Sequence, residues 1–204
     1  MRRAWKIAAA SVALFLMVGC SQTPPTHFYV LELQRSAVVR SQSGEGWAIG
    51  VRSFEVDAPY DRDPIVYRIG EQSPEVRYYA YHHWAAPLSQ MLADSVADGL
   101  TGTEGVRSIE PLMPGRPYDA YLEGRILAVE EVDRAGEQIA RLRIDLLLVS
   151  HEGEVLWSRS LRLDGVTHTT EVVGIVERMN AILAEALSEA GPDLAAALAA
   201  YPAP

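Results

Sequence analysis

The stretch RLRIDLLLV, residues 141–149, alternates charged and apolar side chains over most of its length. The apolar side chains share one face of an extended chain: Leu142, Ile144, Leu146 and Leu148. The other face carries Arg141, Arg143 and Asp145. A period of two is typical of a β-strand with one face in the core and one toward water. The stretch therefore predicts a strand in a sheet that is covered on one side.

The flanking residues extend this strand into a meander. Strand-like runs cover 120–133, 138–150 and 155–163. The segments between them, DRAG (133–136) and HEGE (151–154), are short and polar and contain glycine, which is typical of hairpin turns. The sequence therefore predicts three consecutive antiparallel strands.

The rest of the chain adds further strands and two helical patterns. The strand-like runs occupy 27–33, 47–57, 65–70, 76–84 and 106–112. Helical spacing begins at Pro87 and again at Glu171, and the Gly191-Pro192 pair predicts a break before a short last helix over 193–200. We expect an α/β (α+β) sandwich, with an antiparallel-rich mixed sheet and two main helices packed on it, in a single domain over 27–204.

The N-terminus has the layout of an exported chain. Basic residues precede an apolar run over 7–18, which is too short to span a bilayer comfortably and ends close to Cys20. Cys20 is the only cysteine, so it cannot form an internal disulfide and needs another role. We interpret 1–19 as a signal peptide and 20–26 as a lipidated N-terminus and tether.

The Gly19-Cys20 junction resembles the lipobox of bacterial lipoproteins, with Met17 where leucine is usual. The resemblance implies that Cys20 is the lipid attachment site, and several acyl chains anchor a protein more stably than one. Ser21, rather than aspartate, after Cys20 implies the outer membrane of a Gram-negative cell, with the body facing the periplasm. The formal net charge of −9 argues against nucleic acid as a partner, because it is repelled by a phosphate backbone.

Chemistry-bearing side chains are scattered along the chain. His82 and His83 are neighbours in a predicted strand, so they should point to opposite faces and not share a metal. Asp145 lies between Arg141 and Arg143, and we expect these arginines to balance its charge. No pattern assembles a nucleophile, a base and an oxyanion donor, so we expect no enzyme, no metal and no cofactor.

Several stretches together resemble the ABC-type transport auxiliary lipoproteins. They are HFYVLEL (27–33), AIGVRSFEVDAPYDRDPIVYRIG (48–70), YHHWAAPLSQMLADSVADGL (81–100) and VVGIVERMNAILAEALSEAGPDLAAAL (172–198). His83 stands where the family usually has arginine, and Asp63 is an extra residue in the Pro-Tyr-Asp-Arg turn.

The resemblance implies a non-enzymatic outer-membrane subunit of an MCE-type intermembrane lipid transport system, such as the paraquat-inducible one. Such a subunit docks an MCE-domain protein to the outer membrane, and related proteins are thought to form homo-oligomeric rings. Two alternatives stay open, a periplasmic lipid-binding carrier and a cell-envelope hydrolase. An apolar cavity between sheet and helices would favour the carrier.

Tyrosine and arginine gather next to the family-like turn, and they form a candidate interface: Tyr60, Arg62, Tyr67 and Arg68. These residue types dominate many protein interfaces, because they combine a broad contact face with directional hydrogen bonds. The alternative is that the arginines pair with neighbouring carboxylates on a solvated surface, where ion pairs contribute little.

Overall fold

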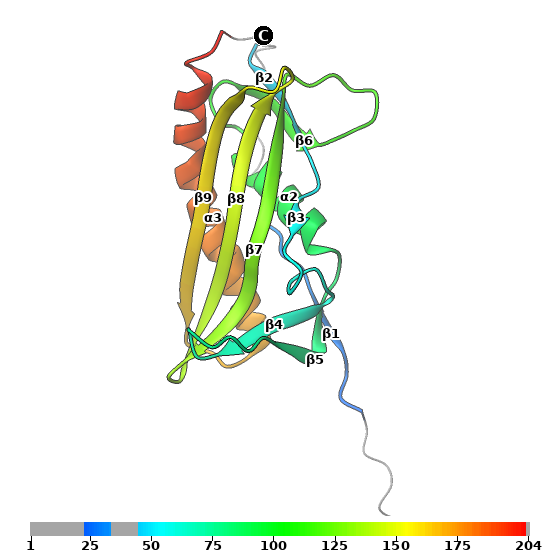
Figure 1. The fold of residues 1–204 in the computed structure, drawn as a ribbon, viewed down its shortest axis with the longest axis vertical. Coiled ribbons are helices and arrows are strands. Elements are labelled where there is room, and N and C mark those ends of the chain that lie inside the picture. Colours follow the sequence, from blue (N-terminus) through cyan, green and yellow to red (C-terminus); the bar gives the residue numbers. More distant parts are fainter. Residues whose placement is uncertain (1–22, 34–44, 203–204) are drawn as a thin grey trace, which may run out of the picture.

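The predicted meander forms the long central part of a sheet. In the computed structural model, which describes residues 23–33 and 45–202, it consists of β7 (Ala120–Arg134), β8 (Glu137–Ser150) and β9 (Val155–Thr167) (Figure 1). The three strands pair antiparallel in sequence order. The signal peptide, Cys20 and the segment 34–44 lie outside the described residues.

Shorter strands pair with the other edge of β7 at three heights. From one end of β7 to the other, these are β2 (Trp47–Val51), β3 (Glu55–Val56) and β4 (Pro64–Ile69), all parallel to β7. The sheet continues beyond β2 with β6 (Val106–Pro111), and beyond β4 with β5 (Arg77–Trp84) and then β1 (His27–Tyr29). Two branches of the sheet therefore lie at opposite ends of β7.

The strand predicted over 47–57 is divided in the structure, because the chain leaves the sheet at Phe54. The Phe54 ring packs on Gly124 of β7, where a Cβ atom would lie 2.5 Å from it. The Phe54 amide donates to the carbonyl of Ser89 at 3.2 Å, rather than to β7. Burial of this ring separates β2 from β3, which corrects the single-strand prediction.

Two α-helices of the described chain cover the same face of the sheet. α3 (Val172–Leu198) packs against β9 and β8, and α2 (Leu88–Leu100) packs against β6 and α3 (Figure 1). The β8 side chains beneath them are the predicted apolar ones, and all are buried: Leu142, Ile144, Leu146 and Leu148. This two-layer arrangement of a mixed sheet and two helices confirms the predicted fold class. Within residues 23–33 and 45–202, no helix is both long and apolar enough to cross a bilayer.

α3 continues through Pro192, so the predicted break and the separate helix over 193–200 were wrong. Proline has no amide hydrogen and normally interrupts a helix. Here the buried stripe of α3 keeps its helical spacing on both sides of the proline: Leu187, Ala190, Leu194 and Leu198. Packing of this stripe outweighs the local preference for a break.

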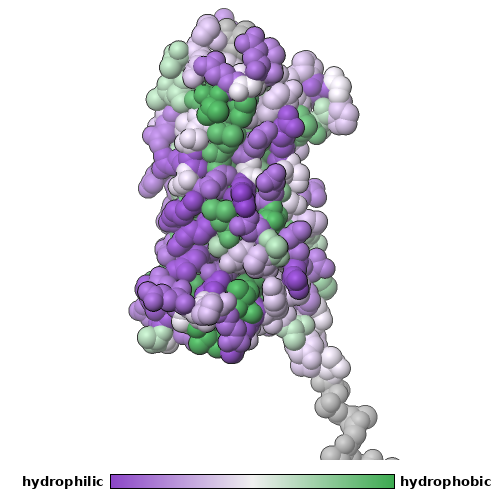
Figure 2. All heavy atoms as spheres, in the orientation of Figure 1, coloured by the Kyte–Doolittle hydropathy of each residue, from purple (hydrophilic) through white to green (hydrophobic). Residues whose placement is uncertain are grey.

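The face of β7, β8 and β9 that points away from the helices is called the outer face. Arg141, Arg143 and Asp145 lie on it, as the alternation in β8 predicts. Hydrophilic side chains cover much of this face over β8 and β9 (Figure 2). One covered side and one polar side explain why β8 alternates so regularly.

Candidate functional site

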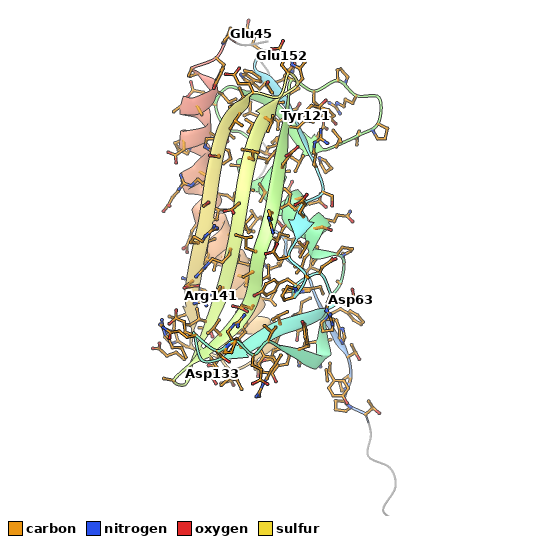
Figure 3. The ribbon with its side chains drawn as sticks, in the orientation of Figure 1. Glu45, Asp63, Tyr121, Asp133, Arg141 and Glu152 are labelled. Atoms are coloured by element: carbon orange, nitrogen blue, oxygen red, sulfur yellow. The ribbon has the colours of Figure 1, made fainter. Side chains whose placement is uncertain are left out.

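The end of β7 that pairs with β4 carries two adjacent buried carboxylates, Glu130 and Glu131. Val66 of β4 pairs with Glu130, and Tyr67 pairs with Glu131. Adjacent strand residues point to opposite faces. Glu130 is opposite Arg141 in the ladder and lies with it on the outer face. This is the end of the meander at which Arg141 and Asp133 are labelled in Figure 3. Glu131 points to the helix side.

Glu130 is only 3 % exposed. Tyr60 Oη donates a hydrogen bond to Glu130 Oε2 at 2.9 Å, and Arg68 Nη2 donates to the same oxygen at 3.1 Å. A second cation, Arg141 Nη1, lies 3.9 Å from Glu130 Oε1. Burial, and then the charge of Glu130, raises the pKa of Tyr60 to about 12, so its hydroxyl remains a donor. This cage of donors compensates the loss of water around the carboxylate.

Glu131 accepts a hydrogen bond from Tyr79, whose Oη donates to Glu131 Oε2 at 2.8 Å. Burial raises the pKa of Glu131, the hydrogen bond from Tyr79 opposes this rise, and the charge of Asp133 adds to it. The Tyr79 ring packs 4.6 Å from the Tyr67 ring and edge-on to His82 at 5.2 Å. Glu131 thus lies under an aromatic cover, with less charge compensation than Glu130.

Glu131→Gln is expected to stabilise the fold at neutral pH. Because the pKa of Glu131 is raised by folding, the folded state binds this proton more tightly than the unfolded state. Wild-type stability therefore falls as pH rises from the unfolded pKa, about 4.3, through the higher folded value. Glutamine does not titrate and still accepts from Tyr79, so its advantage should grow across that window and then stay constant.

Urea unfolding of both chains at a series of pH values measures this difference. Glu152→Gln, in the exposed HEGE turn, is the control and should have little effect on the free energy of unfolding. Destabilisation by Glu131→Gln at neutral pH would show instead that the fold requires the ionised carboxylate.

The adjacent histidines diverge, as the strand alternation predicts. His82 Nδ1 lies 2.7 Å from Tyr29 Oη, whereas His83 Nε2 lies 3.2 Å from the Ala80 carbonyl oxygen. The His27 ring stacks on His82 at 5.2 Å, and burial, followed by the charges of His27 and His83, lowers the pKa of His82. In the part of the chain that the structure describes, no group of three or more His, Cys, Asp or Glu could hold a metal ion.

The charge of Asp145 is balanced by β9 rather than by its neighbours on β8, which corrects the sequence prediction. Arg162 Nη2 and Ser160 Oγ donate to Asp145 Oδ1 at 2.8 and 2.7 Å. Arg141 and Arg143 both bind a β9 carboxylate, that of Asp164. Ser160 is directly opposite Asp145 and Asp164 is directly opposite Arg141, whereas Arg162 and Arg143 reach these carboxylates diagonally across the ladder.

A hollow of about 600 Å³ lies on the outer face, between the β2–β3 connection and the meander. Its lining is largely charged or polar, and includes Arg52, Glu123, Arg125, Asp145 and Ser160. These side chains already have partners: Arg52 pairs with Glu123, and Ser160 with Asp145. This is not the apolar cavity between sheet and helices that would favour a lipid carrier.

The space between the sheet and the helices is filled by side chains. Ile144 of β8 and Ile175 of α3 are fully buried, as are Leu92 of α2 and Leu183 of α3. Close packing of this kind leaves little room for an acyl chain. The carrier alternative thus has no supporting observation in the described part of the chain.

The four residues of the candidate interface do not share one surface. Tyr60 and Arg68 are brought together at Glu130, within the domain. Tyr67 is half-buried beside Tyr79. Arg62 is exposed, and its guanidinium lies 5.2 Å from the ring centre of Tyr78. Arg68 therefore pairs with a distant buried carboxylate and not with the neighbouring carboxylates considered as the alternative.

Sequence reasoning did not find Glu130 and Glu131. The available indication was the segment LAVEEVD, where two adjacent acids interrupt an otherwise apolar strand. Two neighbours on a strand occupy both faces, so at least one should be buried if the strand is central. Their hydrogen-bonding partners Tyr60, Arg68 and Tyr79 lie more than fifty residues away in sequence and could be assigned only from the fold.

The fold also occurs in solved structures. A crystal structure of a Xanthomonas campestris protein of the DUF330 family aligns with a TM-score of 0.66 and 16 % identity, covering 85 % of this chain and 96 % of that one. A second crystal structure, of an uncharacterised protein, aligns with a TM-score of 0.59 and 16 % identity, covering 85 % and 98 %. At these identities the likeness shows the fold alone.

No curated protein matches the sequence. The family model of the ABC-type transport auxiliary lipoprotein component matches residues 29–190. This match runs from β1 to the second half of α3 and includes both branches of the sheet and the Glu130 and Glu131 contacts. The chain therefore belongs to the ABC-type transport auxiliary lipoprotein component family, as an auxiliary component of an ABC-type transport system.

Proposed function

We propose that the protein is a non-enzymatic periplasmic subunit, held in the outer membrane by a lipid on Cys20, that docks the MCE conduit of an intermembrane lipid transport system. The observation that carries this proposal is the family match over residues 29–190. The MCE partner, the outer-membrane address and assembly into a homo-oligomeric ring come from the resemblance in the sequence. Residues 27–204 are the periplasmic domain in this proposal.

The chain order supports an anchor close to the folded domain. Only the six residues 21–26 separate Cys20 from His27, where β1 begins. A fully extended peptide spans at most about 3.5 Å per residue, so this tether keeps β1 within roughly 25 Å of the bilayer. A domain held so close can bridge the membrane and a periplasmic partner.

The candidate interface remains part of the proposal, with Arg62 as its most exposed member. The other three members lie inside the domain at the β4 end of the sheet. Tyr60 and Arg68 bind Glu130, and Tyr67 packs against the Tyr79 ring. Arg62 and Tyr78 then present a cation and an aromatic ring to a partner, a combination common in interfaces.

Arg62→Ala is expected to weaken subunit assembly or partner capture while leaving the melting temperature nearly unchanged. An exposed cation–π contact contributes only about 0.5–1 kcal/mol to stability, so the fold should tolerate its loss. Arg52→Ala is a matched control, because the Arg52 guanidinium lies 4.7 Å from the Tyr121 ring centre near the other end of β7. Capture reduced equally by both variants, or by neither, would place the interface elsewhere.

Co-purification tests the function as a whole. The lipidated protein, isolated from membranes after mild crosslinking, should bring down an MCE-domain protein. A Cys20→Ser chain provides the control for the anchor, because it has no sulfur for acylation. Recovery of a cell-wall enzyme, with no transport component, would contradict the proposal and favour the hydrolase alternative.

A further inference from the structure

The segment 28–31, which covers the end of β1 and the two residues after it, has apolar side chains on both sides. Leu31 is buried in the core, and Tyr29 contacts His82 on the same side. The alternate residues Phe28 and Val30 point the other way and are 66 % and 44 % exposed. Strands with one solvated face normally place polar residues there. Exposed Phe28 and Val30 therefore indicate a second contact, one that residues 23–33 and 45–202 do not provide.

A tyrosine of β5 extends this apolar surface. Phe28 pairs with His83, and their rings lie 6.0 Å apart. Tyr81 is two residues before His83 on β5, and it is also exposed. Phe28, Val30 and Tyr81 are called the β1 patch. β1 is the last strand on this branch of the sheet, which leaves the patch at an edge of the described domain.

The β1 patch lies at the end of the domain that a Cys20 anchor would hold nearest the membrane. Eight residue steps separate Cys20 from Phe28, a reach of at most about 28 Å. β2 and β4 pair with β7 near Tyr121 and Glu131, ten steps apart, which corresponds to roughly 33 Å along the strand. β1 belongs to the β4 branch, and the β6–β7 loop belongs to the opposite end (Figure 1).

We propose that the β1 patch rests in the headgroup region of the bilayer that holds the Cys20 lipid, and so fixes the orientation of the domain. This inference depends on the lipid anchor of the proposed function. Tyr81 has the apolar body and polar tip that favour the membrane interface, and Phe28 and Val30 add apolar surface that can be buried at the acyl boundary. The acyl chains supply the affinity, while Phe28, Val30 and Tyr81 determine which end of the domain faces the lipid.

Site-specific fluorescence on the mature lipoprotein tests the orientation. Cys20 is the only cysteine, and acylation consumes its sulfur, so a cysteine introduced elsewhere is the only thiol free for labelling. Phe28→Cys and Val30→Cys place an environment-sensitive fluorophore in the patch at exposed positions. Met113→Cys is the matched control, because Met113 is an exposed apolar residue of the β6–β7 loop.

Each labelled protein is reconstituted into phosphatidylethanolamine–phosphatidylglycerol vesicles that contain brominated acyl chains. Labels at positions 28 and 30 should shift to the blue and lose intensity to bromine, whereas the label at position 113 should keep its emission in water. Equal quenching at all three positions would overturn the proposal, because the domain would then have no preferred end on the lipid. A blue shift without quenching would overturn it in favour of a protein that covers the patch.

The wild-type chain separates failure of the anchor from failure of the patch. Labelling of wild-type Cys20 would show a free thiol, which refutes the lipid anchor and removes the basis of this orientation. An unlabelled wild type together with unquenched positions 28 and 30 would refute the β1 patch alone and leave the anchor intact.

Discussion

Trp84→Ala is expected to lower the free energy of unfolding by roughly 3–5 kcal/mol, the usual range for truncating a buried aromatic side chain. Trp84 is 4 % exposed and belongs to the main hydrophobic core. It ends β5 just before α2, its amide donates to the Asp63 carbonyl at 2.7 Å, and it pairs with Tyr29 of β1. Loss of the indole would therefore leave a cavity where two strands and a helix meet.

Trp84→Phe distinguishes the volume of the ring from its polarity. The buried Nε1 of Trp84 has no hydrogen-bond partner among the described residues. Phenylalanine keeps much of the volume and removes this unpaired donor, so its effect should be within about 1.5 kcal/mol. Chemical denaturation of the three proteins gives both values. A decrease in the free energy of unfolding below about 1 kcal/mol for Trp84→Ala would show that the surrounding strands and helix relax around a smaller side chain.

Glu130→Ala is expected to lower the free energy of unfolding by about 3 kcal/mol, the low end of the range for breaking a buried ion pair from one side. Tyr60 would lose its acceptor in a buried position, and Arg68 would keep a largely buried charge without its carboxylate. Arg68 is partly exposed, and Arg141 would keep its ion pair with Asp164. Both features should keep the loss of stability below the top of that range.

Glu123→Ala is the matched control on the same strand. Glu123 pairs with Arg52 at 3.3 Å, but both side chains are nearly half exposed. Exposed pairs contribute about 0–1 kcal/mol, so this variant should unfold almost like the wild type. Thermal and urea unfolding measure the loss of stability in Glu130→Ala and in Glu123→Ala. Equal losses would show that the contacts of Glu130 contribute no more than a surface pair.

The meander could be predicted closely, because its evidence is local. Alternation in RLRIDLLLV and the glycine turns DRAG and HEGE define β7, β8 and β9 to within a few residues. The divergence of His82 and His83 follows from the same geometry of a strand. Local geometry is shared by every strand, so these features needed no knowledge of the partner strands.

Predictions failed where distant packing opposed a local preference. Pro192 favours a break, yet Leu194 and Leu198 keep α3 helical by remaining in the core. Arg143 adjoins Asp145 in the alternation, yet it binds Asp164 across the ladder. In each case a contact from another element decided between arrangements that the local sequence allows.

The sequence by itself determined the two-layer fold class, the turns of the meander, the family and Cys20 as the predicted lipid site, because periodicity, turn residues and motif spacing are properties of the chain alone. Only the tertiary structure decided that Glu130 and Glu131 are buried with separate partners, and that Phe28 stays exposed. It also decided that Tyr60 and Arg68 donate hydrogen bonds to Glu130. Burial and charge pairing depend on which distant strands become neighbours, and that pairing is set by the packing of the whole sheet against its helices.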